Sequence, residues 1–161
     1  MHLLLKNLLF TVLVPGTDAV YLPCRLSSLD KARAATAASI ATGSALIALG
    51  LLLYIACLWP FATLGRGTPA PIDPPKQLVV AGPYRFVRNP MYLAVLCVIA
   101  GQAVWHLSGT LAIYGAGVTA MFCLFVQGYE ERTLCRLFGD DYRAYCARVP
   151  RWLPRFPSAR R

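Results

Sequence analysis

Residues 91–126 read MYLAVLCVIAGQAVWHLSGTLAIYGAGVTAMFCLFV, and this stretch indicates how the chain folds. It holds two apolar runs, Met91–Leu107 and Thr110–Val126, which only Ser108-Gly109 separates. Each run approaches the roughly 17–25 residues that a helix needs to cross a hydrocarbon core of about 30 Å. We therefore expect a tight helical hairpin whose two outer ends emerge on the same side of a membrane.

Two further apolar runs precede this hairpin, Leu3–Leu22 and Ala34–Phe61. The first lacks a small-x-small cleavage site and is followed by more apolar sequence, so we interpret it as a retained span rather than a signal peptide. Lys6, Pro15-Gly16 and Asp18 interrupt it, which predicts a kinked or partly interfacial helix. The second run opens with small residues, so its first half is expected to pack closely against another helix.

The composition supports a membrane protein. Hydrophobic residues make up 57% of the 161 residues and charged residues 14%, and the mean hydropathy is +0.53. Soluble domains of this size are rarely so apolar. We predict an all-α polytopic membrane protein with about four transmembrane helices, in a single domain over residues 1–161 that has its N-terminal helices in residues 1–62.

The net charge of +9 arises from basic residues between the apolar runs and in the C-terminal tail. They do not form one stripe with interleaved aromatic residues, so no nucleic-acid partner is expected, whereas membrane lipids are. Basic loops stay in the cytosol. The segment 64–88 and the tail after Gln127 are therefore predicted to lie there.

Two segments near these basic regions have recognisable local patterns. Gly65–Pro75 is rich in glycine and proline and should be an extended cytosolic loop. After Gly128 the sequence is amphipathic, which predicts C-terminal helices lying in the membrane surface with their cations toward lipid phosphate. Gly139-Asp140 is typical of one helix ending and another beginning.

The six cysteines do not indicate a metal site. No two of them have C-x-x-C spacing, and Cys57, Cys97 and Cys123 lie inside apolar runs, where cysteine behaves as a small hydrophobic residue. We expect no metal.

Polar residues gather where the hairpin ends. The segment Lys76–Asn89 leads into the third apolar run, and Glu130-Glu131 directly follows the fourth, so both belong to one membrane face. A structural interpretation remains open, in which Arg88 reaches the lipid headgroups, Asn89 caps a helix that begins at Pro90, and the acids neutralise nearby arginines.

Residues 65–154 resemble the isoprenylcysteine carboxyl methyltransferase and phospholipid N-methyltransferase superfamily of integral membrane enzymes. The matching motifs are, in order, Leu78-Val79-Val80-Ala81-Gly82-Pro83-Tyr84, Arg88-Asn89-Pro90-Met91-Tyr92, Glu130-Glu131, and Leu134 through Phe138-Gly139, Tyr142, Tyr145 and Val149-Pro150. The resemblance implies that residues 65–154 form a cofactor-binding core for S-adenosylmethionine (SAM) on the cytosolic side.

The resemblance also implies the residues that line the SAM pocket. These are Lys76, Gln77, Leu78, Val79, Tyr84, Arg88, Asn89, Pro90, Met91, Tyr92, Glu130 and Glu131. Carboxylates and tyrosine rings can face the cationic sulfonium and amino groups of SAM, while backbone and amide groups can bind adenine and ribose.

Two positions depart from the family pattern. Asn89 stands where the family has histidine, and an amide cannot titrate near neutrality as a general base would. Val126 stands where the prenylcysteine enzymes have an arginine that holds the substrate carboxylate, which disfavours a prenylcysteine substrate.

The resulting hypothesis is SAM-dependent methyl transfer to a lipidic or hydrophobic small molecule, with Glu131 and Arg151 as candidate catalytic residues. Two alternatives stay open: an NADPH-dependent membrane reductase of the steroid-reductase type, for which Lys76, Arg85 and Arg88 could bind a 2′-phosphate, and a non-catalytic membrane scaffold.

Overall fold

The computed structural model describes residues 15–28, 30, 35–60 and 77–154. Within these residues every regular element is helical, as the sequence predicts. The predicted loop Gly65–Pro75, the candidate ligand Lys76 and the beginning of the first apolar run lie outside them.

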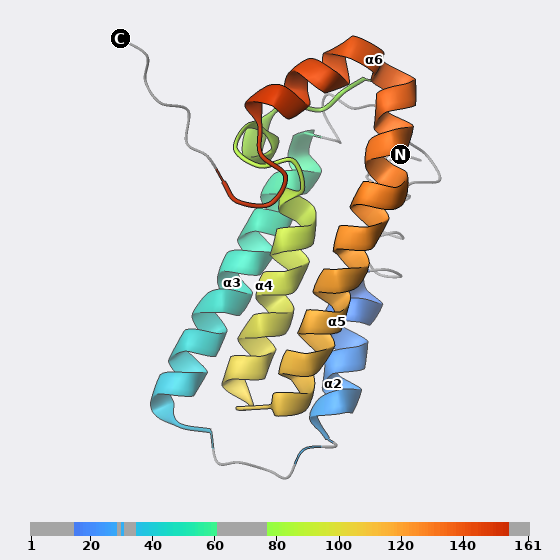
Figure 1. The fold of residues 1–161 in the computed structure, drawn as a ribbon. Coiled ribbons are helices and arrows are strands. Elements are labelled where there is room, and N and C mark those ends of the chain that lie inside the picture. Colours follow the sequence, from blue (N-terminus) through green and yellow to red (C-terminus); the bar gives the residue numbers. More distant parts are fainter. Residues whose placement is uncertain (1–14, 29, 31–34, 61–76, 155–161) are drawn as a thin grey trace, which may run out of the picture.

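Three long helices run side by side: α3 (Ala37–Pro60), α4 (Pro90–Trp105) and α5 (Gly109–Phe125) (Figure 1). The continuous helix Gly109–Arg148 and α3 are long and apolar enough to cross a membrane, and α4 is a shorter apolar helix. Two of the four predicted spans therefore meet this criterion among the described residues.

The hairpin between α4 and α5 is confirmed. Ser108 caps α5, where its hydroxyl oxygen accepts a hydrogen bond from Leu111 N at 3.0 Å. The hydroxyl groups of Ser108 and Thr110 both donate to the carboxylate of Asp30, which ties the segment after α2 (Leu22–Ser27) to the same corner. Side chains thus bond the polar groups at this corner. The other ends of α4 and α5 lie together at the opposite end of the bundle (Figure 1).

Helices α3 and α4 meet along a glycine seam formed by Gly43, Gly50 and Gly101. A Cβ added to Gly50 would lie 2.7 Å from Ala94 O, and one added to Gly101 would lie 2.7 Å from Ile47 Cγ1. Backbones this close leave no room for a side chain, because protein interiors are already densely packed. Gly43 belongs to the first half of α3, so the close packing expected there is present.

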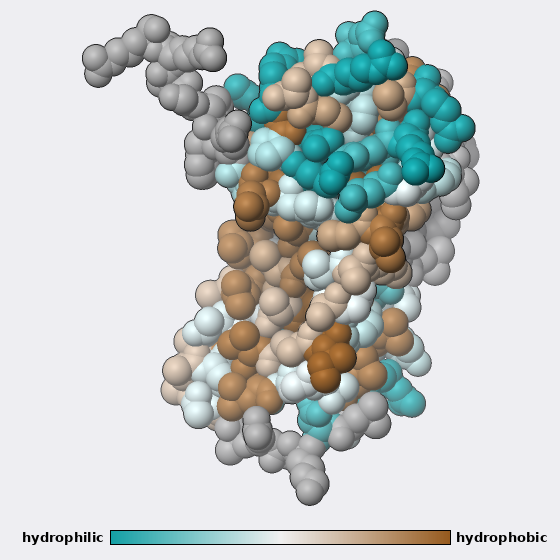
Figure 2. Space-filling model, viewed as in Figure 1, coloured by the Kyte–Doolittle hydropathy of each residue, from teal (hydrophilic) through white to brown (hydrophobic). Residues whose placement is uncertain are grey.

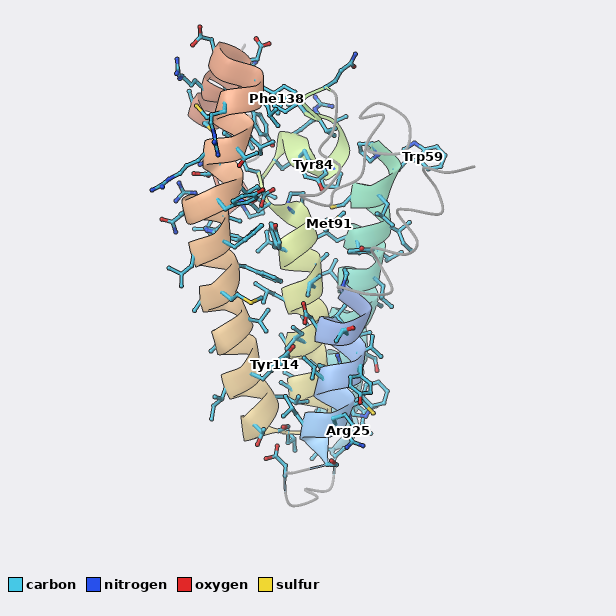
Figure 3. All side chains as sticks on the ribbon, turned by 90° about the vertical axis from the view of Figure 1, so that its right-hand side faces the viewer. Arg25, Trp59, Tyr84, Met91, Tyr114 and Phe138 are labelled. Atoms are coloured by element: carbon cyan, nitrogen blue, oxygen red, sulfur yellow. The ribbon has the colours of Figure 1, made fainter. Side chains whose placement is uncertain are left out.

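The first apolar run is irregular where the sequence suggested. A π turn, η1 (Thr17–Tyr21), precedes α2. Tyr114 Oη on α5 donates to Asp18 O at 2.8 Å, and Gln102 Nε2 on α4 donates to Ala19 O at 2.6 Å; Figure 3 labels Tyr114. These bonds give partners to backbone carbonyls that face the other helices.

A second π turn, η4 (Val126–Glu130), joins α5 to α6 (Glu131–Arg148). Inside α6 Gly139 has φ 52° and ψ −123°, so the predicted break there is confirmed. The second half of α6 turns across the end of the bundle (Figure 1). In the face drawn in Figure 2, hydrophilic residues gather at this end, and mainly apolar residues cover the bundle below it.

Candidate functional site at the α4–α6 end of the bundle

Three chain segments meet at the polar end of the bundle. They are residues 77–89, which include the short 3-10 helix η3 (Gly82–Arg85), the α5–α6 junction, and the C-terminal segment after α6. Arg88 N donates to Pro150 O at 2.9 Å, and Tyr145 Oη donates to Tyr84 O at 2.7 Å. Backbone groups therefore fix the segment that precedes α4.

The π turn η4 sets the directions of the two glutamates. Glu131 N donates to Val126 O, a bond five residues long that places one extra residue in the turn. Because each helical residue rotates the chain by about 100°, this extra residue changes which side chains of α6 face α4. Glu130 and Glu131 then meet different partners.

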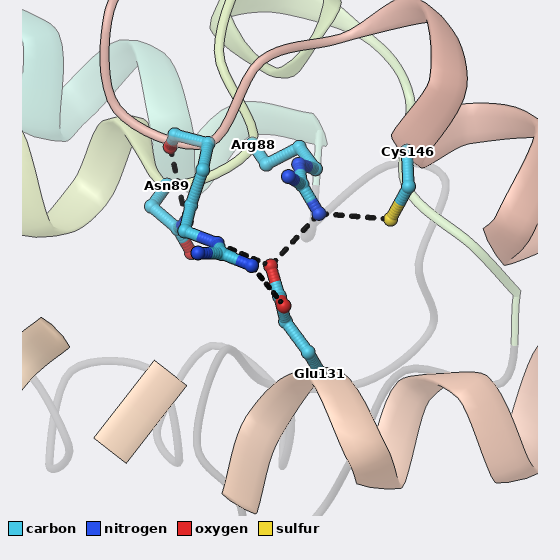
Figure 4. A network of polar contacts seen from close by, with 5 residues as sticks. Arg88, Asn89, Glu131 and Cys146 are labelled. Carbon is cyan, nitrogen blue, oxygen red and sulfur yellow. Dashed lines mark hydrogen bonds and ion pairs between the residues drawn. The ribbon is translucent and has the colours of Figure 1, made fainter. Parts of the chain in front are cut away.

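Glu131 is held by two arginines (Figure 4). Arg88 Nη1 donates to its Oε1 at 2.8 Å, and Arg151 donates from Nε to Oε1 and from Nη2 to Oε2, both at 2.8 Å. The hydrogen bond with Glu131 raises the pKa of Arg151. Both oxygens of Glu131 are thus engaged, and we call Arg88, Glu131 and Arg151 the ionic clamp.

Glu130 has a different environment. Tyr92 Oη donates to its Oε2 at 2.7 Å, and among the described residues its other oxygen accepts no hydrogen bond. Burial raises the pKa of Glu130 above its usual value, against the lowering effect of the Tyr92 bond, and the charge of Glu131 adds to the rise. A cation close to Glu130 would relieve this cost of desolvating a negative charge.

Aromatic rings surround the group that holds Glu130. The Tyr92 ring lies with its centroid 4.6 Å from that of Phe122 and 6.4 Å from that of Trp152. Trp152 follows Arg151 on the C-terminal segment, so the clamp and the aromatic contacts hold that segment over the start of α4. The ring faces can attract a cation.

A pocket opens between these groups, with an empty volume of about 580 Å³ that includes its mouth. Its walls combine apolar, aromatic and charged side chains, as small-molecule sites usually do. The lining residues are Leu78, Val79, Tyr84, Arg88, Asn89, Glu130, Glu131, Leu134, Tyr142 and Tyr145. Arg88 Nε is buried here and has no hydrogen-bond partner among the described residues.

The structure distributes the predicted site residues unevenly. Leu78, Val79, Tyr84, Arg88, Asn89, Glu130 and Glu131 line the pocket. Gln77 lines a neighbouring, more open groove, and Pro90 and Met91 form the first turn of α4. Tyr92 acts on the pocket through Glu130, and Arg151, a catalytic candidate, touches Glu131 from outside the lining.

Three lining residues were not predicted as ligands: Leu134, Tyr142 and Tyr145. They belong to the C-terminal motif, where they recur at helical spacing, but the position of α6 over the pocket depends on the bend at Gly139. Their spacing showed that they share a face. It did not show what that face covers.

Asn89 and Val126 have clear structural roles. Asn89 is the N-cap residue of α4, the position that the structural interpretation gave it, but its side chain makes no capping hydrogen bond. Its Nδ2 instead donates to Arg151 O at 3.1 Å. Val126 is 0% exposed, so apolar packing fills the position where prenylcysteine enzymes carry an arginine.

Part of the chain is similar in sequence to known proteins. A family model described as phospholipid methyltransferase matches residues 38–141. Methanethiol S-methyltransferase 1 of Bradyrhizobium diazoefficiens is 38% identical over 71 residues, which are 44% of this chain and 24% of the relative. No solved structure matches the chain.

Proposed function

Because the chain belongs to the phospholipid methyltransferase family, we propose that it transfers a methyl group from SAM to a hydrophobic or lipidic small molecule at the cytosolic membrane face. The observation that carries this proposal is Glu130: a partly buried carboxylate with a raised pKa, facing a pocket, and oriented by a tyrosine of a neighbouring helix. Such a group is suited to a cationic ligand.

The residues present fit SAM in charge as well as in position. Glu130 would face its ammonium or sulfonium group, and the buried Arg88 Nε has a free donor for its carboxylate. Tyr84 and Tyr145 provide aromatic surface in the same pocket. The ligand thus meets a carboxylate, a guanidinium donor and rings, which match its three chemical parts.

When bound, SAM supplies a methyl group that is already activated by the sulfonium charge. The protein then needs chiefly to align the acceptor and exclude water. The ionic clamp positions two walls of the site. Glu131 is fixed by three hydrogen bonds, and through them it holds Arg88 and the C-terminal segment in place. In this account Glu131 and Arg151 are positioning residues.

The relative's name gives one acceptor class to test, a small thiol. In that reaction a carbon–sulfur bond forms to the acceptor as the bond from methyl carbon to the sulfonium sulfur breaks, and the thiol proton passes to solvent. The buried Val126 agrees with an acceptor that lacks a carboxylate. Membrane-embedded α3 and α5 would let an apolar acceptor arrive from the bilayer.

The test uses the full chain reconstituted in vesicles with deuteromethyl SAM. One arm contains methanethiol, a second contains a phospholipid extract, and a third contains neither. We expect a deuteromethyl mass gain in one of the first two arms, and its loss in Glu130→Gln. Stabilisation of the protein by NADPH but not by SAM would instead favour a reductase, and stabilisation by neither would favour a scaffold.

A further inference from the structure

The bend in α6 creates a second polar site on the outer side of that helix. An open groove is lined there by Arg132, Cys135, Arg136 and Arg143. None of the four lines the pocket that holds Glu130 and Glu131. The groove is therefore a separate feature of the same end of the molecule.

The groove exists because of Gly139. On a straight helix Cys135 and Arg143 would be about 12 Å apart along the axis. The left-handed φ of 52° at Gly139 bends the helix, and Cys135 and Arg143 then line the same groove. Arginines from both halves of α6 thus converge on one concavity.

The positive charge in the groove is poorly neutralised. Within the described part of the chain, Arg132 and Arg136 form no ion pair. Arg136 makes only long bonds, to Arg132 O at 3.4 Å and Thr133 Oγ1 at 3.5 Å. Arg143 pairs with Asp140 at 2.7 Å, but both side chains are largely exposed, at 70% and 93%, so water screens this pair strongly.

The direction of the arginines points to the membrane. Side chains on a helix lean toward its N-terminus, and the first half of α6 continues the apolar helix α5 through η4. Arg132 and Arg136 therefore lean back toward the end of the apolar segment, at headgroup level. Guanidinium groups match phosphate oxygens in pairs, and anionic lipids attract such clusters.

We propose that the groove formed by Arg132, Arg136 and Arg143 over the Gly139 bend binds the phosphate of an anionic phospholipid in the adjoining leaflet. The bound lipid fixes the angle between the two halves of α6. Since the second half carries Tyr142 and Tyr145 of the pocket, lipid binding would also steady that wall.

The test compares the thermal midpoint of the full chain in detergent after addition of phosphatidylglycerol, of phosphatidylcholine with the same acyl chains, or of glycerol 3-phosphate. We expect phosphatidylglycerol to raise the midpoint by about 4 °C more than phosphatidylcholine does. The triple variant R132Q/R136Q/R143Q should lose most of this difference, and Arg136→Gln about half.

Arg148→Gln is the matched control, because it removes the same charge from an exposed arginine of α6 outside the groove. It should keep the full difference. A second readout uses the chain without substitutions and so does not depend on whether the variants fold. The rate at which Cys135 is alkylated, measured by peptide mass spectrometry, should fall when phosphatidylglycerol is added. A difference retained by the triple variant, an equal loss in Arg148→Gln, unchanged alkylation, or equal stabilisation by glycerol 3-phosphate would each overturn the proposal.

Discussion

The glycine seam and the ionic clamp join helices in opposite ways. At the seam, α3 and α4 touch through backbone because Gly50 and Gly101 have no side chains. At the clamp, Arg88 from before α4 and Arg151 from after α6 reach across space to Glu131. The first contact leaves no room for a Cβ, while the second borders a pocket lined by charged side chains.

The two contacts have different roles in the fold. The seam fixes where α4 stands, and so where Asn89 and Tyr92 lie, through packing that solvent conditions hardly alter. The clamp holds the segments around the pocket through charge, which responds to pH and to ligands. The fold thus sets a contact made by packing next to a contact made by charge.

The largest expected effect comes from breaking the seam with Gly101→Leu. A Cβ alone would approach Ile47 Cγ1 to 2.7 Å and Gly43 O to 2.8 Å, so a leucine must push α3 away from α4. We expect no folded protein by size-exclusion chromatography in detergent. Gly117→Leu on α5 is the control, since nothing lies within 4 Å of a Cβ there; if both variants fold equally well, the seam is not a close contact.

Breaking the clamp should have the next largest effect. Glu131→Ala leaves two guanidinium groups without their carboxylate, and Arg88 is only 13% exposed at its side chain. We expect the free energy of unfolding to fall by about 3 kcal/mol, measured by titration with sodium dodecyl sulfate and tryptophan fluorescence. Asp140→Ala, which removes the exposed pair with Arg143, should have no measurable effect, and equal losses would contradict the clamp.

The stability of the protein should depend on pH through Glu130 in the pocket, but not through the glycine seam. Because the folded-state pKa of Glu130 is raised, the folded protein binds its proton more tightly than the unfolded chain does, so stability without ligand falls as pH rises through that pKa. SAM affinity should change in the opposite direction, weakening by up to about tenfold per pH unit below that pKa, where the carboxylate is protonated. Calorimetry at several pH values measures this, and a similar slope in Glu130→Gln would assign it to another group.

The smallest effect is expected at Asn89. Asn89→Ala removes the hydrogen bond from Nδ2 to Arg151 O, which should lower the thermal midpoint by the equivalent of about 1 kcal/mol. Asn89→His keeps an N–H donor and should stay close to the unaltered protein. A histidine variant that is as unstable as the alanine variant would show that the amide has some other role.

The fold could be predicted from the sequence where the pattern is local. The apolar runs and Ser108-Gly109 predicted the hairpin, and the small residues of α3 predicted close packing. Position alone placed the segment before α4 beside Glu130-Glu131, because a hairpin returns to its starting face. These inferences needed only helix geometry and chain connectivity.

The details of the site could not be predicted in the same way. The different environments of Glu130 and Glu131 depend on the π turn η4, which has no recognisable sequence signal. The Asn89 bond depends on where Arg151 lies after the chain has bent at Gly139 and turned back. Such contacts join residues far apart in sequence, and periodicity carries no information about them.

In the proposed function Glu130 faces SAM, whereas Glu131 holds the segments around the pocket together. Calorimetric titration of SAM into the detergent-purified chain, with the thermal midpoint recorded for each variant, tests it most directly. Glu130→Gln should lose most of its SAM affinity and keep its thermal midpoint. Glu131→Gln should chiefly lower the thermal midpoint. SAM binding by Glu130→Gln with unchanged affinity would contradict the account.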